Sequence, residues 1–250
     1  MKLELDCGNS RVKWRVRSGD KIVMRGAFQS DEGFNSETTD ELAALGLQQV
    51  LVGSVLGDEF ARKLAFWSIS RLGLNPQFAV SEPFCNGVVN GYQQPEKLGV
   101  DRWLAILAAR AKAPSAFVVV DSGSAITVDL VTSQGEHLGG YIAPGLRLMR
   151  EALATKTSAI KLGQIGYPDN DFPGRNTVTA IKSAELAMIS GLVAHARSIL
   201  RNYDSHDANL WVTGGDGEWL VAMLKEGIYH EDLVLDGLEI ALAEAKTEKV

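Results

Sequence analysis

Hydrophobic and polar residues alternate near the N-terminus in the way that is typical of strands with one buried face. A first strand is expected over 2–6, where leucines alternate with charged residues, and it ends in the sequence Asp-Cys-Gly-Asn-Ser. Val12, Trp14 and Val16 then alternate with basic residues, and a Ser-Gly-Asp turn leads into a third segment over 22–28. This period of two predicts a unit of three antiparallel strands.

The same pattern occurs a second time. An apolar strand over 116–120 is broken by Asp121-Ser-Gly-Ser-Ala, and strands over 126–131 and 137–142 follow, separated by a Gly-containing turn. Asp121 thus ends its strand as Asp6 ends the first one. Repetition on this scale predicts a duplicated fold with two similar lobes rather than a solenoid.

After each three-strand unit, helical periodicity alternates with single apolar strands. In the first lobe we expect further strands over 49–52 and 77–80 and helices over 58–72 and 98–113. In the second lobe we expect helices over 145–154 and 177–202, a strand over 210–213 and later helices. This order predicts an α/β fold in which each lobe is a mixed sheet flanked by helices. Pro114 follows a helical pattern and precedes a buried strand, so we place the boundary there, giving lobes 1–113 and 114–250 with the ligand site in the cleft between them.

Charge and composition exclude some classes of protein. The 250 residues are 46% hydrophobic, enough for a sizeable core. The net charge is −6 with a pI near 5.3, and the basic residues are scattered, which argues against a dedicated nucleic-acid partner. Acidic residues interrupt the N-terminal apolar run where a signal peptide would need continuity, and charged residues interrupt the apolar stretch 184–200. We therefore expect a cytoplasmic protein without a membrane partner.

Cysteine and histidine spacing gives no sign of a metal finger or a disulfide framework. Cys7 and Cys85 are far apart, and none of the four histidines has a partner at ligand spacing. We expect both thiols to be reduced and the histidines to have surface or packing roles.

The segment Asp-x-Gly-Asn-Ser is the first candidate for chemistry. It places a carboxylate, a flexible glycine and small polar side chains in one tight hairpin, whose N–H groups can face a phosphate. Asp6 would then hold a hydrated magnesium ion or position the transferred phosphoryl group. A plain tight turn is the alternative. The second copy, with Asp121, Gly123 and Ser124, would face the first across the cleft so that both hairpins grip one polyphosphate.

A third glycine cluster, Thr213-Gly-Gly-Asp216, follows an apolar strand and precedes a helix. Its N–H groups and the helix N-terminus could receive a nucleotide, although a simple strand-to-helix turn capped by Asp216 would have the same sequence. The chain contains no Walker loop and no dinucleotide-binding fingerprint that would compete for this role.

These three clusters, in this order, resemble the phosphate and adenosine elements of the acetate and sugar kinase/Hsp70/actin superfamily. Three further motifs narrow the resemblance: Gly99-Val-Asp-Arg-Trp103, Gly139-Gly-Tyr-Ile-Ala-Pro-Gly145 and Asn176-Thr177. Together they resemble type III pantothenate kinases over nearly the whole chain. The resemblance implies two ribonuclease-H-like (actin-like) lobes.

The resemblance also implies a reaction, in which the γ-phosphoryl group of ATP passes to pantothenate as the first step of coenzyme A biosynthesis. It further implies ATP with Mg²⁺, a monovalent cation that is K⁺ or NH₄⁺, and a homodimer in which Thr177 or its helix reaches the acceptor site of the partner. The implied ATP-binding residues are Asp6, Cys7, Gly8, Asn9, Ser10, Arg11, Val12, Lys13 and Ser124. The implied pantothenate-binding residues are Tyr92, Gly99, Val100, Asp101, Arg102 and Thr177. Asp121 matches the cation ligand and Asp101 the proton acceptor.

Departures from the family pattern are mild. Ser10 and Ser124 stand where threonine is common, and Ala184 stands where a glycine often follows the Asn-Thr helix start. Both serines keep the hydroxyl group, so the catalytic role is retained, whereas the affinity for cation or nucleotide could differ.

Other functions remain open on the sequence. A related kinase for a sugar, acetate or amide acceptor would share the phosphate elements, and a regulatory protein could bind nucleotide without turnover. A nuclease of the ribonuclease-H-like fold fits less well, because that chemistry needs several carboxylates around two metals. Asp101 and Arg102 could also be a solvated pair at a helix start.

Overall fold

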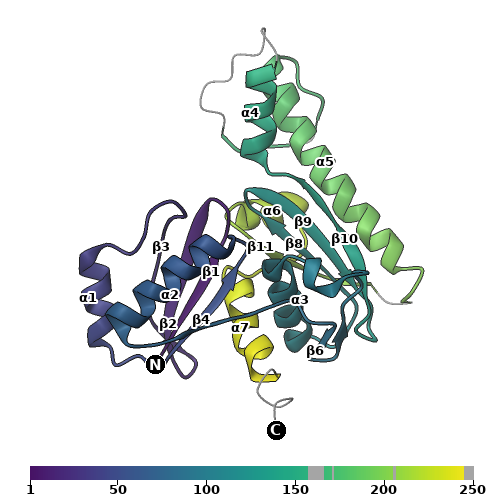
Figure 1. Ribbon diagram of the computed structural model, residues 1–250. Helices are drawn as coiled ribbons and strands as arrows, with labels where there is room; N and C mark the ends of the chain where they lie inside the picture. Colours follow the sequence, from purple (N-terminus) through teal and green to yellow (C-terminus); the bar gives the residue numbers. More distant parts are fainter. Residues whose placement is uncertain (157–165, 171, 205–206, 245–250) are drawn as a thin grey trace. The chain divides into compact units, whose positions relative to one another are not determined.

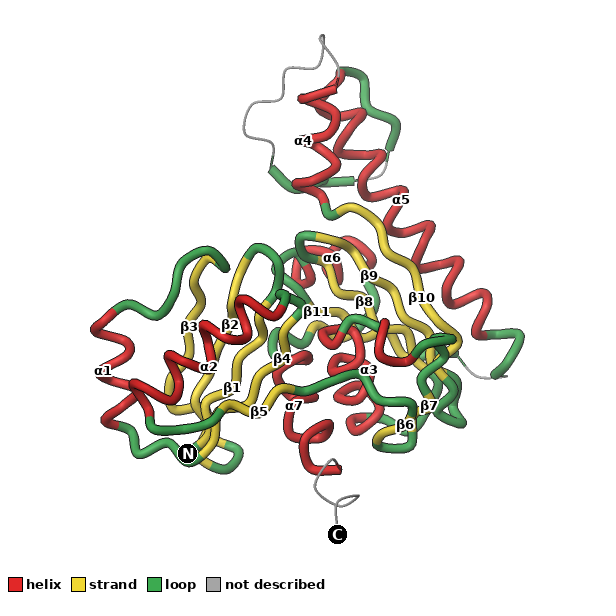
Figure 2. Tube along the Cα trace, in the orientation of Figure 1, coloured by secondary structure: helices red, strands yellow, loops and turns green. Residues whose placement is uncertain are grey.

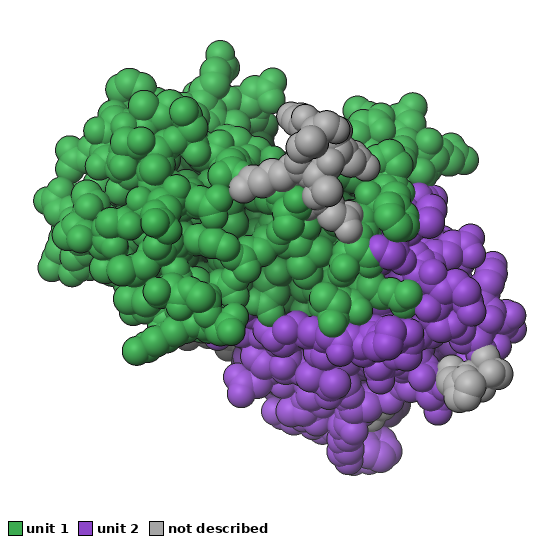
Figure 3. All heavy atoms as spheres, turned by 90° about the horizontal axis from the view of Figure 1, so that it is seen from below, with its two compact units in different colours: residues 1–86, 92–111, 233–250 green, residues 87–91, 112–232 purple. Residues whose placement is uncertain are grey.

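The computed structural model describes residues 1–156, 166–170, 172–204 and 207–244. The chain forms two compact units, coloured separately in Figure 3. Unit 1 comprises Met1–Asn86, Tyr92–Ala111 and Leu233–Val250, and unit 2 comprises Gly87–Gly91 and Lys112–Asp232. The division therefore departs from a single split after residue 113, because the C-terminal helix groups with unit 1 and the segment 87–91 with unit 2.

The sheet of unit 1 has five strands in the order β3-β2-β1-β4-β5. The strands are β1 (Lys2–Cys7), β2 (Arg11–Ser18), β3 (Lys21–Gln29), β4 (Gln49–Ser54) and β5 (Pro76–Phe78). The first three are antiparallel, whereas β4 and β5 continue the sheet in parallel to β1, as the alternating pattern and the intervening helices predict. The helices are α1 (Ser36–Ala44), α2 (Asp58–Leu72), η1 (Pro95–Lys97), α3 (Val100–Lys112) and α7 (Leu233–Glu244). Helix α1 was not predicted.

Unit 2 repeats this topology, with the strand order β10-β9-β8-β11-β12 (Figure 2). Its strands are β8 (Phe117–Ser122), β9 (Ala125–Val131), β10 (His137–Pro144), β11 (Asn209–Thr213) and β12 (Ile228–Tyr229). Its helices are α4 (Leu146–Lys156), α5 (Thr177–Leu200) and α6 (Gly217–Leu224); two short strands, β6 (Phe84–Cys85) and β7 (Val88–Val89), precede α3 in the chain. The equal order and direction of the strands confirm the predicted α/β duplication.

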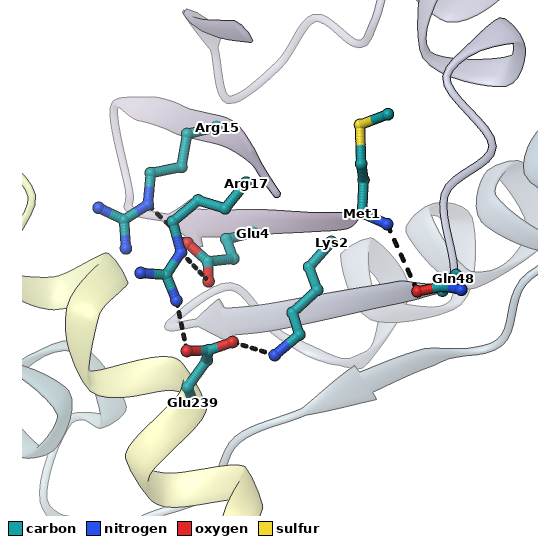
Figure 4. A network of polar contacts seen from close by, with 7 residues as sticks. All are labelled: Met1, Lys2, Glu4, Arg15, Arg17, Gln48 and Glu239. Atoms are coloured by element: carbon teal, nitrogen blue, oxygen red, sulfur yellow. Dashed lines mark hydrogen bonds and ion pairs between the residues drawn. The ribbon is translucent and has the colours of Figure 1, made fainter. Parts of the chain in front are cut away.

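Helix α7 belongs with unit 1 because it packs against β1 and β4 and because charged side chains bind it there. Glu4 of β1 is fully buried and accepts hydrogen bonds from Arg15 Nε at 2.5 Å and from Arg17 Nε at 3.1 Å (Figure 4). Arg17 and Lys2 also pair with Glu239 of α7. Burial raises the pKa of Glu4, while the Arg15 guanidinium acts to lower it. The C-terminal helix is thus held by ion pairs to the first two strands.

In unit 2, α4 and the first turns of α5 extend beyond the end of β10, away from the sheet (Figure 1). The later turns of α5 pack on β8 and β9. Among the described residues, α5 is long and apolar enough, by length and composition alone, to cross a membrane, although charged residues interrupt 184–200. A core helix of a soluble protein can have the same length and composition, and α5 contributes a buried stripe to the core of unit 2. The stripe consists of Leu186, Ile189, Val193, Ala196 and Leu200.

Candidate active site

The first phosphate hairpin joins β1 to β2 in unit 1. Asp6 is half-buried at the end of β1 and lies opposite Lys13 in the register of the pair. Inside the turn, the Gly8 N–H donates to the Arg11 carbonyl at 3.1 Å, and the Gly8 carbonyl accepts from the Ser30 hydroxyl at 2.6 Å. The Gly8 N–H is therefore used within the turn, and the end of β3 holds the hairpin in place.

Not all side chains of this hairpin can meet a ligand. Cys7 and Val12 are buried, so any contact with a nucleotide would come from their main chain. Burial raises the pKa of the Cys7 thiol, and the charge of Asp6 raises it further, so this thiol stays neutral. Asn9 and Arg11 are exposed, and they present polar side chains at the tip of the hairpin.

The second hairpin, between β8 and β9, is built in the same way. The Gly123 N–H donates to the Ala125 carbonyl at 3.0 Å, and the Ser124 carbonyl accepts from the Gly145 N–H at 3.1 Å. Gly145 immediately follows β10, just as Ser30 follows β3. A side chain at Gly145 would place a Cβ atom 2.2 Å from the Gly123 carbonyl oxygen, so only glycine allows this close approach.

The third glycine cluster meets the second hairpin at Asp121. Thr213 of β11 lies beside Asp121 of β8 in parallel register, and Gly214 follows with φ +91°. A Cβ atom on Gly214 would lie 2.3 Å from the Asp121 Oδ1 atom. The Asp216 N–H donates to the Ser122 carbonyl at 2.9 Å. The second hairpin, Gly145 and the cluster 213–216 are therefore packed together in unit 2.

Asp216 takes the position before α6, but its side chain does not cap the helix. It accepts a hydrogen bond from the Tyr167 hydroxyl at 2.8 Å, and this bond raises the pKa of Tyr167. The Tyr167 ring stacks on Trp219, with centroids 5.1 Å apart. The capping role considered for Asp216 is thus not observed. Tyr167 was missed by the sequence analysis, because no motif or spacing marks it.

The predicted acceptor segment begins α3 in unit 1. The Asp101 Oδ1 atom accepts the Arg102 N–H at 2.8 Å. A Cβ atom on Gly99 would lie 2.6 Å from this same oxygen, so glycine leaves room for the carboxylate. Arg102 is 5% exposed; its Nη1 donates to the Tyr92 hydroxyl at 2.6 Å, and its Cζ lies 5.4 Å from the centre of the Tyr92 ring. The structure thus brings Tyr92, Asp101 and Arg102 together and does not leave Arg102 as a solvated charge.

Packing also connects this segment to the first hairpin within unit 1. Gly53 of β4 lies beside Asp6 in the sheet. The Cα of Gly53 lies close to the Leu104 side chain, because a Cβ atom there would be 2.6 Å from Leu104 Cδ1. Leu104 is one turn beyond Asp101 on α3. The end of β1 and the start of α3 therefore belong to one packed neighbourhood.

Thr177 lies in a different part of the molecule, at the exposed start of α5 in unit 2. Asn176 caps this helix: its side chain accepts the Thr179 N–H at 2.9 Å, and its own N–H donates to the Thr179 hydroxyl at 3.2 Å, which completes a capping box. Thr177 lines a hollow of about 430 Å³ between α4 and α5. The mostly apolar lining consists of Met149, Leu153, Thr177, Ala180, Ile181, Ala184, Glu185 and Met188.

Comparison with known proteins identifies the family. A family model described as type III pantothenate kinase matches residues 2–198. The chain belongs to the type III pantothenate kinase family. It is 39% identical over 245 residues to a type III pantothenate kinase of Cellvibrio japonicus, with 96% of each chain covered. It is 36% identical over 246 residues to one of Pseudomonas fluorescens, covering 96% of this chain and 98% of the relative.

Solved structures confirm the fold class. A Campylobacter jejuni protein described as a Baf family transcriptional activator matches with a TM-score of 0.64 at 22% identity, covering 98% of this chain and 99% of the other. A Sinorhizobium meliloti protein described as a 2-dehydro-3-deoxygalactonokinase matches with a TM-score of 0.58 at 12% identity, with the same coverage. At these identities the likeness shows the actin-like kinase fold alone.

Family membership establishes the reaction. The chain is an ATP-dependent kinase that phosphorylates pantothenate in coenzyme A biosynthesis, and such a kinase uses a divalent metal ion with ATP. Among the described residues, no group of three or more histidine, cysteine, aspartate or glutamate side chains could hold a metal by itself.

Proposed function

We propose that Asp101 is the proton acceptor of this pantothenate kinase and that Tyr92 and Arg102 bind the acceptor. The observation that carries the proposal is the cluster at the start of α3, where the Asp101 carboxylate lies between Gly99 and the Arg102 N–H. Arg102 is fixed by the Tyr92 hydroxyl and ring, and a fixed guanidinium can bind both oxygens of a carboxylate. Pantothenate carries such a carboxylate together with the hydroxyl that is phosphorylated.

In this proposal Asp101 orients the pantothenate hydroxyl and accepts its proton as the phosphoryl group transfers. Its Oδ1 atom is held by the Arg102 N–H, which restricts rotation of the carboxylate. Positioning of this kind accounts for most of the catalysis in phosphoryl transfer, because there is little covalent chemistry for the protein to perform.

Each hairpin offers polar groups that would bind phosphate oxygens of ATP. Asn9, Ser10, Arg11 and Lys13 have exposed or half-buried side chains in the first hairpin, and Ser124 is exposed in the second. Arg11 and Lys13 would offset phosphate charge. Bound Mg²⁺ would neutralise charge on the phosphate oxygens, with Asp6 holding one of its water molecules.

Asp121 is proposed as the ligand of a monovalent cation, K⁺ or NH₄⁺. The donors around it are hard oxygen atoms, which suit such cations: its own carboxylate and the nearby Ser122 carbonyl, both close to Gly214. The register of the two hairpins gives a further reason. Asp6 lies opposite Lys13, whereas Asp121 lies opposite the uncharged Thr127. A cation bound at Asp121 would place a positive charge beside the carboxylate there.

We also propose a cytoplasmic homodimer that uses the α4–α5 region and requires no nucleic-acid or membrane partner. This region exposes large apolar side chains next to Thr177, which supports an interface there. The exposed side chains are Leu148, Leu153, Val178 and Met188. Sedimentation equilibrium should give the mass of a dimer; a monomer at micromolar concentration would contradict this part of the proposal.

The site assignment is tested by ADP production with Mg-ATP, with and without pantothenate, in potassium and in sodium buffer, with the product identified by mass. We expect turnover to require pantothenate and to be much faster in potassium. Arg102→Lys should raise the KM for pantothenate, because a point charge does not reproduce the planar fork. An unchanged KM for pantothenate in that variant would refute the acceptor site proposed here.

A further inference from the structure

A buried histidine outside every motif is fixed against the chain immediately before Tyr92. His137, the first residue of β10, is 1% exposed, and its Nε2 atom lies 2.9 Å from Oδ1 of Asp129, which is also 1% exposed. The other ring nitrogen, Nδ1, accepts the Gly91 N–H at 3.4 Å. Because the N–H of Gly91 can only donate, this pattern assigns Nδ1 as the acceptor and places the ring proton on Nε2, toward Asp129.

The contact with Gly91 is close along the main chain as well. A Cβ atom on Gly91 would lie 1.7 Å from the His137 carbonyl oxygen, so no other residue fits there without movement of the backbone. Two residues earlier, the Val89 N–H donates to the Gly135 carbonyl at 2.9 Å, and Val89 forms a β-bridge with Glu136. The segment 88–91 is therefore fixed in register against the start of β10.

We propose that His137 is a positioning residue for the pantothenate site. Gly91 is joined to Tyr92 by one peptide bond, so fixing Gly91 restricts where Tyr92 can be. Tyr92 in turn holds Arg102 through its hydroxyl and its ring. In this proposal His137 acts through Gly91 and Tyr92. The inference rests on the acceptor site proposed above and adds the residue that determines its position.

The test separates the two hydrogen bonds of the imidazole. In His137→Asn, an amide oxygen near the place of Nδ1 can still accept from Gly91. In His137→Gln, the amide lies near the place of Nε2, so the contact with Asp129 is kept and the acceptor for Gly91 is lost. His195→Gln is the matched control, because His195 is exposed on α5. Steady-state KM and kcat for both substrates, with the melting temperature, are measured for each variant.

We expect His137→Gln to raise the KM for pantothenate about five- to tenfold, the loss that corresponds to one hydrogen bond, with the KM for ATP and kcat within about twofold of wild type. His137→Asn should lie closer to wild type, and His195→Gln should equal it. In a Tyr92→Phe background, His137→Gln should have a smaller effect than it has alone, because both changes affect the same contact.

An unchanged KM for pantothenate in folded His137→Gln would overturn the inference, as would equal rises in both KM values. If His137→Gln does not fold, His137→Asn is compared with wild type instead, both alone and in the Tyr92→Phe background. Additive effects of the two substitutions would overturn the inference, and non-additive effects would support it. Arg102→Lys tests the acceptor site independently. A raised KM there, with no effect at His137, would leave the proposed site standing and remove only the role of His137.

Discussion

Gly99→Ala should slow phosphoryl transfer although it removes no functional group. The new Cβ atom would lie 2.6 Å from the Asp101 Oδ1 atom, whereas ordinary contacts begin near 3.4 Å, so the carboxylate would have to move by about 0.8 Å. A misplacement of about 1 Å can cost about 10²-fold in rate, or roughly 2.7 kcal/mol of activation free energy. We expect a fall in kcat of that order. Because Gly99 does not have a positive φ, the backbone itself tolerates alanine.

The comparison with Asp101→Asn makes this reasoning testable. Loss of a general base typically costs about 10²- to 10⁴-fold, so Asp101→Asn should lose about 3 to 5 kcal/mol of transition-state stabilisation. If Gly99→Ala acts through the carboxylate, the double variant should be no slower than Asp101→Asn alone. Coupled measurement of ADP release gives kcat for all three variants. Gly57→Ala is the control, since Gly57 also precedes a helix and no atom lies within 4 Å of its added Cβ.

Three results would count against this account of the site. Wild-type turnover in Asp101→Asn would exclude Asp101 as the proton acceptor. A multiplicative loss in the double variant would show that Gly99→Ala acts elsewhere, for instance on pantothenate binding. A slow Gly57→Ala variant would show that alanine before a helix is harmful for reasons unrelated to Asp101.

Three further predictions concern charge. Thr127→Lys places an ammonium group opposite Asp121, as Lys13 stands opposite Asp6, and should reduce the ratio of activity in potassium to that in sodium; an unchanged ratio would argue against the cation site. Arg15→Met removes one of the two arginines that balance the charge of buried Glu4. The free energy of unfolding in urea should fall by about 3 kcal/mol, the lower end for a broken buried ion pair. Burial alone would raise the pKa of Glu239. Its hydrogen bond with a lysine and the nearby arginine charge lower the pKa by more than burial raises it, so the net pKa lies below the ordinary 4.5. Its stabilising effect is present above that ordinary value and is lost as the pH falls through the lowered pKa. Glu239→Gln should therefore flatten the fall in melting temperature between about pH 5 and 3, whereas an unchanged slope would contradict the shift.

The sequence predicts the duplicated sheets well because their signal is local. Strand alternation, the Gly-containing hairpins and the helices between single strands are each determined by short stretches of sequence, and each unit has the expected mixed sheet. The position of α7 could not be predicted in this way. In the sequence, Arg15 is one polar residue of an alternating strand. It can be buried because a helix more than 200 residues later supplies Asp236 at 2.8 Å.

The candidate site shows the same limit. Motifs place Asp6, Asp101 and Asp121 at the ends or starts of elements, because these positions follow from local turns and helix signals. The contact between Tyr92 and Arg102 depends on packing, and the sequence alone left Arg102 open as a solvated charge. His137 was expected to have only a surface or packing role, because the chain around it carries no motif and its partners Gly91 and Asp129 come from separate segments.

The duplication also separates what the fold determines from what the side chains determine. In both units the residue after the third strand donates a hydrogen bond to a carbonyl group of the hairpin. The donor is the Ser30 hydroxyl in unit 1 and the Gly145 N–H in unit 2. The carboxylate at the end of the first strand is likewise common to both. The residue opposite it differs, a lysine in unit 1 and a threonine in unit 2. If Asp121 binds the proposed cation, two similar scaffolds differ in function through one cross-strand position, which holds a lysine in the first unit and would leave the positive charge to a bound ion in the second.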